Sequence, residues 1–219
     1  PLAGQPPGPH ARAGLSLAQA ILITGFDAFG EHRDQGRNPS ALVAQALDGH
    51  VLAGRPVVGR CLPTEFGSAR SALHKLLAET HPALVLCLGL AGGRDKISLE
   101  RVAINVDDAR IADNAGQQPI DEPIEAGGPP AYFSTLPLKA CTQALIEAGL
   151  AAEVSNSAGT FVCNHVFYSL MHALGSASSA GMARAGFVHL PWLPEQGTPH
   201  LRLEQMIQAV QIIAETALS

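Results

Sequence analysis

The stretch Leu84-Val85-Leu86-Cys87-Leu88 is apolar at every residue over the length of a short β-strand. Apolar side chains on both faces of a strand are typical of a parallel sheet that helices cover on both sides. Apolar or alternating runs of similar length predict further strands at residues 20–24, 57–61, 98–105, 152–155 and 186–190.

Patterns typical of amphipathic helices separate these strands. The expected helices begin near Asn38-Pro39, at Thr135-Leu136-Pro137, at Cys163 and near Thr198-Pro199, and one more runs through Ala69, Leu73, Leu76 and Leu77. This alternation predicts an α/β fold, a single-domain α/β/α sandwich with a mostly parallel, twisted sheet. The loop over residues 107–130 is long, acidic and rich in Gly and Pro, and loops of this length in compact domains are usually functional or mobile.

Size and charge limit the classes of protein that the chain can belong to. Of its 219 residues 47% are hydrophobic, so residues 17–219 can form one catalytic domain with a substantial core. Residues 1–16 are rich in Pro, Gly and Ala, and we expect them to be a flexible N-terminal extension. A net charge of -5, with 14 scattered Lys and Arg residues, argues against nucleic-acid binding. No uncharged apolar run is long enough to predict a membrane span.

The four cysteines are Cys61, Cys87, Cys141 and Cys163, and they are widely spaced. No two of them form a CxxC pair, so neither a disulfide framework nor a zinc site is expected. We therefore expect no metal ion and a reducing, cytoplasmic location.

One cysteine lies in a setting that favours chemistry. The segment Ser157-Ala158-Gly159-Thr160-Phe161-Val162-Cys163-Asn164-His165 leaves a predicted strand through small residues and places Cys163 where a helix begins. Unpaired N–H groups and the positive end of the helix dipole favour the thiolate there. The pattern predicts a nucleophilic Cys163 with a lowered pKa in a cysteine hydrolase, although most free cysteines are inert core residues.

A cysteine nucleophile needs a base, and the chain has nine histidines. His165 and His172 follow Cys163 on the same predicted helix, where the helical spacing turns them away from the thiol. His189 ends the strand at residues 186–190, and catalytic groups in parallel sheets gather at the carboxyl ends of strands. We expect His189 to be the base, with a hydrogen-bonded core histidine as the alternative interpretation.

Glu100 is the expected partner of that base. It lies within the otherwise apolar stretch of residues 97–104, where an ionised carboxylate requires a partner, and an imidazole is a suitable one. The alternative interpretation is an ion pair with Arg94 or Arg101.

Five ordered blocks of sequence carry a resemblance to a known enzyme family. They are TGFDAFG (Thr24–Gly30) with Asn38-Pro39-Ser40, GLAGGR (Gly89–Arg94) with ISLERVAIN (Ile97–Asn105), DARIADN (Asp108–Asn114) with QPID (Gln118–Asp121), SAGTFVCN (Ser157–Asn164) and FVHLPWLPEQ (Phe187–Gln196). On these blocks the chain resembles the pyroglutamyl peptidase I (pyrrolidone-carboxylate peptidase) family from about Ile21 to Gln196.

The resemblance implies a cysteine exopeptidase that removes an N-terminal pyroglutamyl residue from peptides through a thioester acyl-enzyme. The family's catalytic cysteine, histidine and glutamate fall on Cys163, His189 and Glu100. The resemblance further implies that the enzyme uses no cofactor and forms a homo-oligomer, a dimer or a tetramer.

The resemblance also implies an apolar pocket, since the pyroglutamyl group is a neutral lactam without a free ammonium. Gly92, Gly93 and Arg94 are expected to shape or support the oxyanion site. The family's substrate-binding residues fall on Phe26, Phe29, Asn38, Ile111, Phe161 and Val162.

Leu90 departs from the family pattern, because many relatives carry a glutamine there that helps to order the pocket loop beside Asn38. We therefore expect the loop from Phe26 to Asn38 to be less firmly ordered and substrate affinity to be weak. This departure motivates an alternative function, a pyroglutamyl- or lactam-binding protein of the same fold with weak or no turnover. A third alternative is a nucleoside-phosphorylase-like enzyme, but the chain has no phosphate-binding motif to support it.

Overall fold

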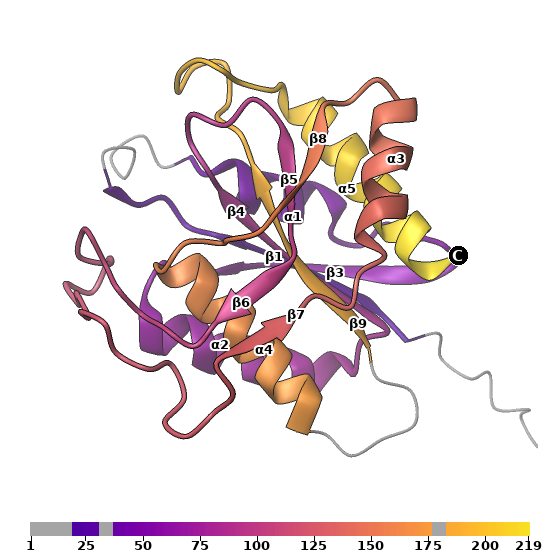
Figure 1. Cartoon of the computed structure of the whole chain (residues 1–219). Coiled ribbons are helices and arrows are strands. Elements are labelled where there is room, and N and C mark those ends of the chain that lie inside the picture. The colour runs from indigo at the N-terminus through magenta and orange to yellow at the C-terminus, as the bar shows by residue number, and fades with distance from the viewer. Residues whose placement is uncertain (1–18, 31–36, 177–182) are drawn as a thin grey trace, which may run out of the picture.

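The computed structural model describes residues 19–30, 37–176 and 183–219, so the expected N-terminal extension lies outside the described residues. Its main sheet has seven strands in the order β2-β3-β1-β4-β9-β5-β8 (Figure 1). The strands are β1 (Ile21–Phe26), β2 (Val51–Leu52), β3 (Arg55–Leu62), β4 (Leu84–Leu90), β5 (Ile97–Glu100), β8 (Ala152–Ser155) and β9 (Arg184–Leu190).

The sheet is mixed but mostly parallel, which confirms the predicted fold class. Strand β1 runs parallel to β3 and β4, β4 runs parallel to β9, and β5 runs parallel to β8. The exceptions are the short hairpin of β2 and β3 and the pairing of β5 with β9, which are antiparallel. The antiparallel register places Ser98 opposite His189 and Glu100 opposite Phe187. Glu100 and His189 are therefore diagonal neighbours on one face of the sheet.

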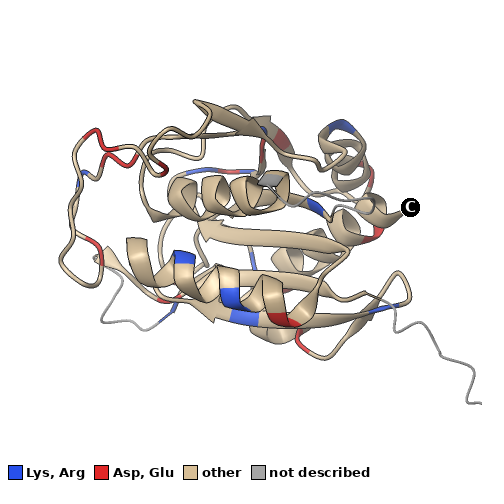
Figure 2. Cartoon of the chain, turned by 90° about the horizontal axis from the view of Figure 1, so that it is seen from below, with Lys and Arg blue, Asp and Glu red and all other residues tan. Residues whose placement is uncertain are grey.

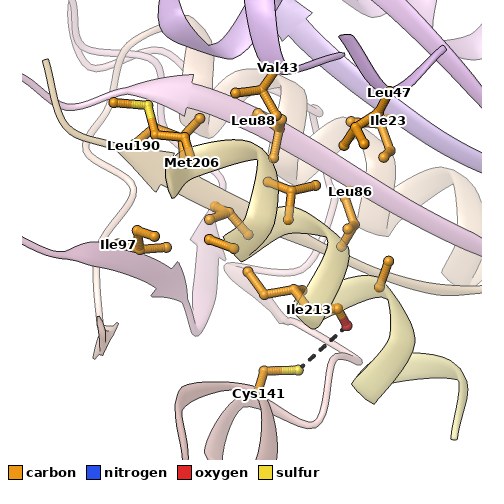
Figure 3. Packing of buried hydrophobic residues seen from close by; sticks show 14 of the residues in the cluster. Ile23, Val43, Leu47, Leu86, Leu88, Ile97, Cys141, Leu190, Met206 and Ile213 are labelled. Carbon is orange, nitrogen blue, oxygen red and sulfur yellow. Dashed lines mark hydrogen bonds between the residues drawn. The ribbon is translucent and has the colours of Figure 1, made fainter. Parts of the chain in front are cut away.

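Helices cover both faces of the sheet, as expected for a strand such as β4 that is apolar throughout. One face packs against α1, α3 and α5 and the other against α2 and α4, each around its own cluster of buried apolar side chains (Figure 1). In the first cluster, Met206 and Ile213 of α5 pack over β4 and β9, and the Cys141 thiol of α3 contacts the Ile213 carbonyl oxygen (Figure 3). The helices are α1 (Pro39–Leu47), α2 (Phe66–Thr80), α3 (Leu138–Glu147), α4 (Val162–Ser176) and α5 (Leu203–Leu218).

The short strands β2 and β7 (Ala131–Phe133) were not predicted, and two of the predicted elements have other bounds in the structure. The strand predicted over residues 98–105 is divided at Arg101 between β5 and β6 (Val102–Ile104), because the Arg101 N–H bonds to β8 while its carbonyl accepts from Ser134. Strand β6 pairs with β7 in a separate two-stranded sheet that packs on α4. The last helix begins at Leu203 instead of near Thr198, since the chain before it is bonded back toward Trp192 by the Leu201 N–H.

The long loop between β6 and β7 contains no helix or longer strand, as its composition predicts. It is held by an isolated antiparallel bridge between Asp107 and Glu122. Several acidic residues lie along this loop, and Lys and Arg are scattered over the elements in the view of Figure 2. In the part of the chain that the structure describes, no helix is long and apolar enough to cross a membrane.

Candidate active site

The first turn of α4 holds Cys163 against the sheet. The loop from β8 reaches the helix through Gly159, whose left-handed backbone (φ 78°) suits glycine. The Cys163 sulfur then lies over Gly89 near the end of β4, where a Cβ added to Gly89 would stand 2.9 Å from Sγ. Contacts shorter than 3 Å are too close for real Cβ atoms. Only glycine at residue 89 therefore leaves room for the thiol.

Gly89 also places the thiol beside the expected base. In the parallel pairing of β4 and β9, Gly89 lies directly across from His189. Neighbouring strands are about 4.8 Å apart and paired residues face the same side, so the sulfur above Gly89 and the imidazole of His189 lie on one face of the sheet near the carboxyl ends of β4 and β9. Both side chains line the same cavity.

The imidazole is held from its other side by a buried carboxylate. His189 Nδ1 lies 2.7 Å from Glu100 Oε1, and the Glu100 side chain is fully buried. The same oxygen accepts a hydrogen bond from Arg94 at 2.9 Å. The expected imidazole partner and the alternative arginine partner of Glu100 are therefore both present.

These contacts keep Glu100 ionised. Burial alone would favour the neutral acid, but the hydrogen bond and charge of His189, with the hydrogen bond from Arg94, hold the pKa of Glu100 below its ordinary value. An ionised Glu100 can only accept, so His189 Nδ1 must carry the proton that it donates. This arrangement leaves Nε2 as the basic nitrogen of the imidazole.

The thiol itself does not have the lowered pKa that its place at a helix start predicts. Burial raises the pKa of the Cys163 thiol to about 12, and the nearby charge of Glu100 adds to the shift, while Arg94 opposes it. The prediction of a lowered pKa is wrong for the unliganded protein, because loss of hydration and the charge of Glu100 outweigh the favourable setting at the helix start. Cys163 is therefore a neutral thiol that shares its cavity with the imidazole of His189.

The thiol and the imidazole open into a cavity of about 480 Å³. Apolar side chains form much of its wall, as expected, but Arg94, Asp108 and Arg110 add charge. A ring the size of a five-membered lactam fits a cavity of this volume. The lining residues are Phe29, Leu90, Ala91, Gly92, Arg94, Asp108, Arg110, Ile111, Ala158, Gly159, Thr160, Phe161, Cys163 and His189.

Three of the six predicted substrate-binding residues line this cavity, namely Phe29, Ile111 and Phe161. The other three do not. Phe26 and Val162 are buried in the core cluster under α2 and α4, because their side chains point to the interior of the sandwich. Asn38 is buried at the N-cap of α1, where its side chain accepts from the Ser40 N–H.

The three residues expected at the oxyanion site form a turn after β4. Gly92 and Arg94 line the cavity, whereas Gly93 supplies a left-handed backbone conformation (φ 83°). Gly92 packs so closely on the Trp192 ring that a Cβ there would lie 2.4 Å from it. The two glycines allow the chain to turn, and the turn points Arg94 at Glu100.

Comparison with known proteins decides the family. The family of pyroglutamyl peptidases matches residues 19–219 of this sequence. The chain belongs to the pyroglutamyl peptidase family. A pyrrolidone-carboxylate peptidase of Cupriavidus taiwanensis is 52% identical over 204 residues, which are 91% of this chain and 93% of the relative. One of Klebsiella pneumoniae is 52% identical over 200 residues, with 91% of each chain covered.

Solved structures of pyroglutamyl peptidases have the same fold. Pyroglutamyl peptidase I of Bacillus amyloliquefaciens superposes with a TM-score of 0.86 at 39% identity, over 91% of this chain and 95% of the other. Pyrrolidone carboxyl peptidase of Thermococcus litoralis superposes with a TM-score of 0.87 at 37% identity, over 91% and 93%. The resemblance inferred from the sequence blocks is confirmed, and these names give no support to a binding protein without turnover.

In this pyroglutamyl peptidase family member, Leu90 lines the cavity and Asn38 has other partners. Asn38 donates to the Asp27 carbonyl at 2.9 Å and accepts from the N–H and hydroxyl of Ser40. Asp27 also accepts hydrogen bonds from Thr64 and Asn114. It therefore connects the three segments that contain Asn38, Thr64 and Asn114. Residues 31–36 of the loop that was expected to be less ordered lie outside the described residues.

The sequence did not reveal the roles of Gly89, which lies beneath the thiol, and of Asp27, which is bonded to Asn38, Thr64 and Asn114. Both lie within quoted blocks, GLAGGR and TGFDAFG, but a glycine and a loop aspartate have many possible roles. Only the pairing of β4 with β9, and the approach of α4, give Gly89 its place.

Proposed function

We propose that this protein hydrolyses the amide bond that follows an N-terminal pyroglutamyl residue, with Cys163 as nucleophile, His189 as acid and base, and Glu100 as the orienting carboxylate. The single observation that carries the proposal is the bond of 2.7 Å between His189 Nδ1 and buried Glu100, in a cavity that His189 shares with Cys163.

In the first half of the reaction, His189 Nε2 takes the thiol proton while Sγ attacks the pyroglutamyl carbonyl carbon. A neutral thiol suits this step, because proton transfer and attack occur together and no thiolate has to be stored in a buried site. The imidazolium then gives its proton to the departing amine as the C–N bond breaks. The products are a thioester on Cys163 and the shortened peptide.

In the second half, water adds to the thioester while His189 Nε2 accepts one of its protons. The C–S bond breaks, pyroglutamate leaves, and the proton returns to Cys163. Ionised Glu100 stabilises the imidazolium of both steps and keeps Nδ1 protonated. We assign stabilisation of the carbonyl oxygen to the turn of Gly92, Gly93 and Arg94, since this turn borders the cavity beside the thiol.

The cavity suits a neutral lactam in preference to an ordinary N-terminus. Phe29, Ile111 and Phe161 offer an apolar surface to the ring. Arg94 is paired with Glu100, and Arg110 offsets the charge of Asp108, so the wall has no net negative charge to attract an ammonium group. We propose pyroglutamyl peptides as substrates on this ground, and on the names of the relatives.

The decisive experiment is hydrolysis of a chromogenic pyroglutamyl amide by the wild type, Cys163→Ala and Cys61→Ala. We expect turnover in the wild type, none in Cys163→Ala, and normal turnover in Cys61→Ala, whose cysteine is exposed. Mass spectrometry of the quenched reaction should find the pyroglutamyl group on Cys163. Turnover in Cys163→Ala near the wild-type rate would exclude the covalent mechanism, and lactam binding without turnover in the wild type would favour a binding protein.

The proposal also covers the cellular location and the oligomeric state of the protein. A catalytic thiol must stay reduced, so we place the protein in the cytoplasm. We also propose that it forms a homo-oligomer, a dimer or a tetramer, for which the exposed side chains of Phe133 and Ile120 offer apolar surface. Analytical ultracentrifugation tests the second statement, and a monomer at micromolar concentration would contradict it.

A further inference from the structure

The residues that follow Cys163 on α4 hold the chain segment that leads into the cavity wall. Asn164 is fully buried and makes three hydrogen bonds to the backbone of β6 and the next residues. Its side chain accepts from the Ile104 N–H at 3.0 Å and donates to the carbonyls of Ile104 and Val106 at 2.9 and 3.0 Å. The helix start that carries the nucleophile is thus bonded to the segment at residues 104–106.

The next helix residue continues this attachment with a charged hydrogen bond. His165 Nδ1 lies 2.7 Å from Asp107 Oδ2, and only 6% of each residue is exposed. The remaining polar atoms of the pair, His165 Nε2 and Asp107 Oδ1, are buried and have no hydrogen-bond partner within the described residues. The two side chains therefore depend on each other. His165 points away from Cys163, as the helical spacing predicts, but it is a buried hydrogen-bonding residue.

The segment enters the cavity wall immediately after Asp107. The Asp108 N–H donates to the Thr160 carbonyl at 2.9 Å, and the Thr160 hydroxyl donates back to the Asp108 carbonyl at 2.7 Å. Asp108, Arg110 and Ile111 then line the cavity that Cys163 also lines. The distance from Cys163 to this wall is consequently set by bonds to α4 and to the loop that precedes it.

A row of aromatic contacts links His165 to the cavity by a second route. Its ring meets Phe66 edge to face at a centroid distance of 5.5 Å, and Phe66 meets Phe161 in the same way at 5.5 Å. Phe161 in turn packs on Phe29 at 5.9 Å. Phe161 and Phe29 are cavity residues, so the imidazole is connected through Phe66 to the aromatic part of the cavity wall.

We propose that His165 and Asp107 are a positioning pair that sets the width of the lactam pocket relative to the Cys163 nucleophile. Neither residue lines the cavity beside the thiol, so the pair acts through Asp108, Ile111 and Phe161. Its loss weakens the binding of the pyroglutamyl group and leaves the chemistry of Cys163, His189 and Glu100 in place. This inference rests on the proposed function.

Two matched substitutions at residue 165 isolate the hydrogen bond. In His165→Asn the amide nitrogen takes the place of imidazole Nδ1 and can still donate to Asp107, whereas in His165→Gln it takes the place of Nε2. Both variants lose the ring that contacts Phe66, so the difference between them reports on the bond alone. We expect His165→Gln to raise KM for a pyroglutamyl amide about tenfold more than His165→Asn does, the scale of one hydrogen bond to a charged group.

The other readouts distinguish a positioning role from general damage. The value of kcat should stay within about threefold of the wild type in both variants, and the inhibition constant of 2-pyrrolidone, the bare lactam, should rise in parallel with KM. Equal KM values for the two variants, or a loss in kcat without a change in KM, would overturn the proposal.

Two further measurements test the pair if His165→Gln does not fold or if the wild type has no peptidase activity. If circular dichroism shows that His165→Gln does not fold, Asp107→Asn tests the pair instead. The amide of Asn keeps the shape of the Asp107 carboxylate and removes its charge. We expect the KM of Asp107→Asn to rise at least about threefold with kcat within about twofold of the wild type, and an unchanged KM would overturn the positioning role of the pair.

If the wild type hydrolyses no pyroglutamyl amide, the proposed function fails. Binding of 2-pyrrolidone followed by protein NMR then tests the pair, because binding requires no turnover.

Discussion

The sulfur of Cys163 occupies the space that a side chain of residue 89 would fill, with Sγ 2.9 Å from the place of a Cβ on Gly89. A glycine in the centre of a sheet weakens a strand, so its presence requires a reason. Here the reason is the close approach of the Cys163 sulfur to β4, the strand that pairs with β9 and so with His189.

Gly89→Ala tests this relationship. The added methyl group would also lie 2.8 Å from the ring of Phe187, so the thiol and that ring must both move. We expect kcat to fall at least about 100-fold, since a misplacement of about 1 Å has that cost. The matched control is Gly67→Ala on α2, where nothing lies within 4 Å and alanine favours the helix. Full activity in Gly89→Ala would show that the sulfur does not need this space.

Ionisation of Cys163 is the second prediction. Because burial raises the pKa of this thiol to about 12, the wild type and Cys163→Ser should have the same thiolate absorbance near 240 nm from about pH 6 to pH 9. A thiolate signal that the wild type gains near pH 7, and Cys163→Ser lacks, would show that the helix start and His189 do lower the pKa.

The same shift predicts a change in stability at alkaline pH. The folded protein retains the Cys163 proton between the ordinary thiol pKa near 9 and the folded value of about 12, whereas the unfolded chain releases it. The stabilisation from the neutral thiol is complete below pH 9 and is lost as the pH rises toward 12. We expect the free energy of unfolding to decline more steeply over this window in the wild type than in Cys163→Ser. Parallel declines would contradict the raised pKa.

Glu100→Gln separates catalysis from structure. The amide keeps the shape but loses the charge that stabilises the imidazolium, so we expect kcat to fall about 100-fold, the usual scale for a disturbed acid-base residue. The lowered pKa of Glu100 means that its ionised form stabilises the fold above the unfolded carboxyl pKa, and this contribution is lost as the pH falls through the lower folded value. The stability difference from the wild type should therefore shrink below about pH 4. If Glu100→Gln were less stable but fully active, Glu100 would be a structural partner of Arg94 alone.

Leu90→Gln addresses the departure from the family pattern. Asn38 already bonds to Asp27 and Ser40, so a glutamine at residue 90 has little tethering to restore. We expect the KM of Leu90→Gln to differ from that of the wild type by less than about threefold. The control Leu90→Met, which has a similar side-chain volume, should show an equally small change in KM. A drop in KM of tenfold or more in Leu90→Gln alone would show that the tether was missing and that weak affinity follows from Leu90.

Local sequence patterns were enough to predict the fold class and the three candidate catalytic residues. The apolar run of β4 indicates a sheet covered on both faces, and Cys163 and His189 stand at the boundaries of a helix and a strand that their own periodicity reveals. Glu100 was detectable because a charge in an apolar strand needs a partner. The sequence named an imidazole as its expected partner and an arginine as the alternative, and the structure places both His189 and Arg94 on one of its oxygens.

Tertiary structure alone decided the properties that depend on contacts between distant segments. The pKa of Cys163 follows from how closely the sheet and the helix exclude water, and a helix dipole read from the sequence gives the opposite sign. Whether Phe26 or Phe29 faces the cavity depends on how the chain turns after β1, since both are phenylalanines in one short block. The place of Gly89 beneath the thiol depends on three segments meeting, β4, β9 and the start of α4. The periodicity of a sequence indicates which side of its helix or strand a residue faces. The packing of the helices and strands determines which other residues it contacts on that side.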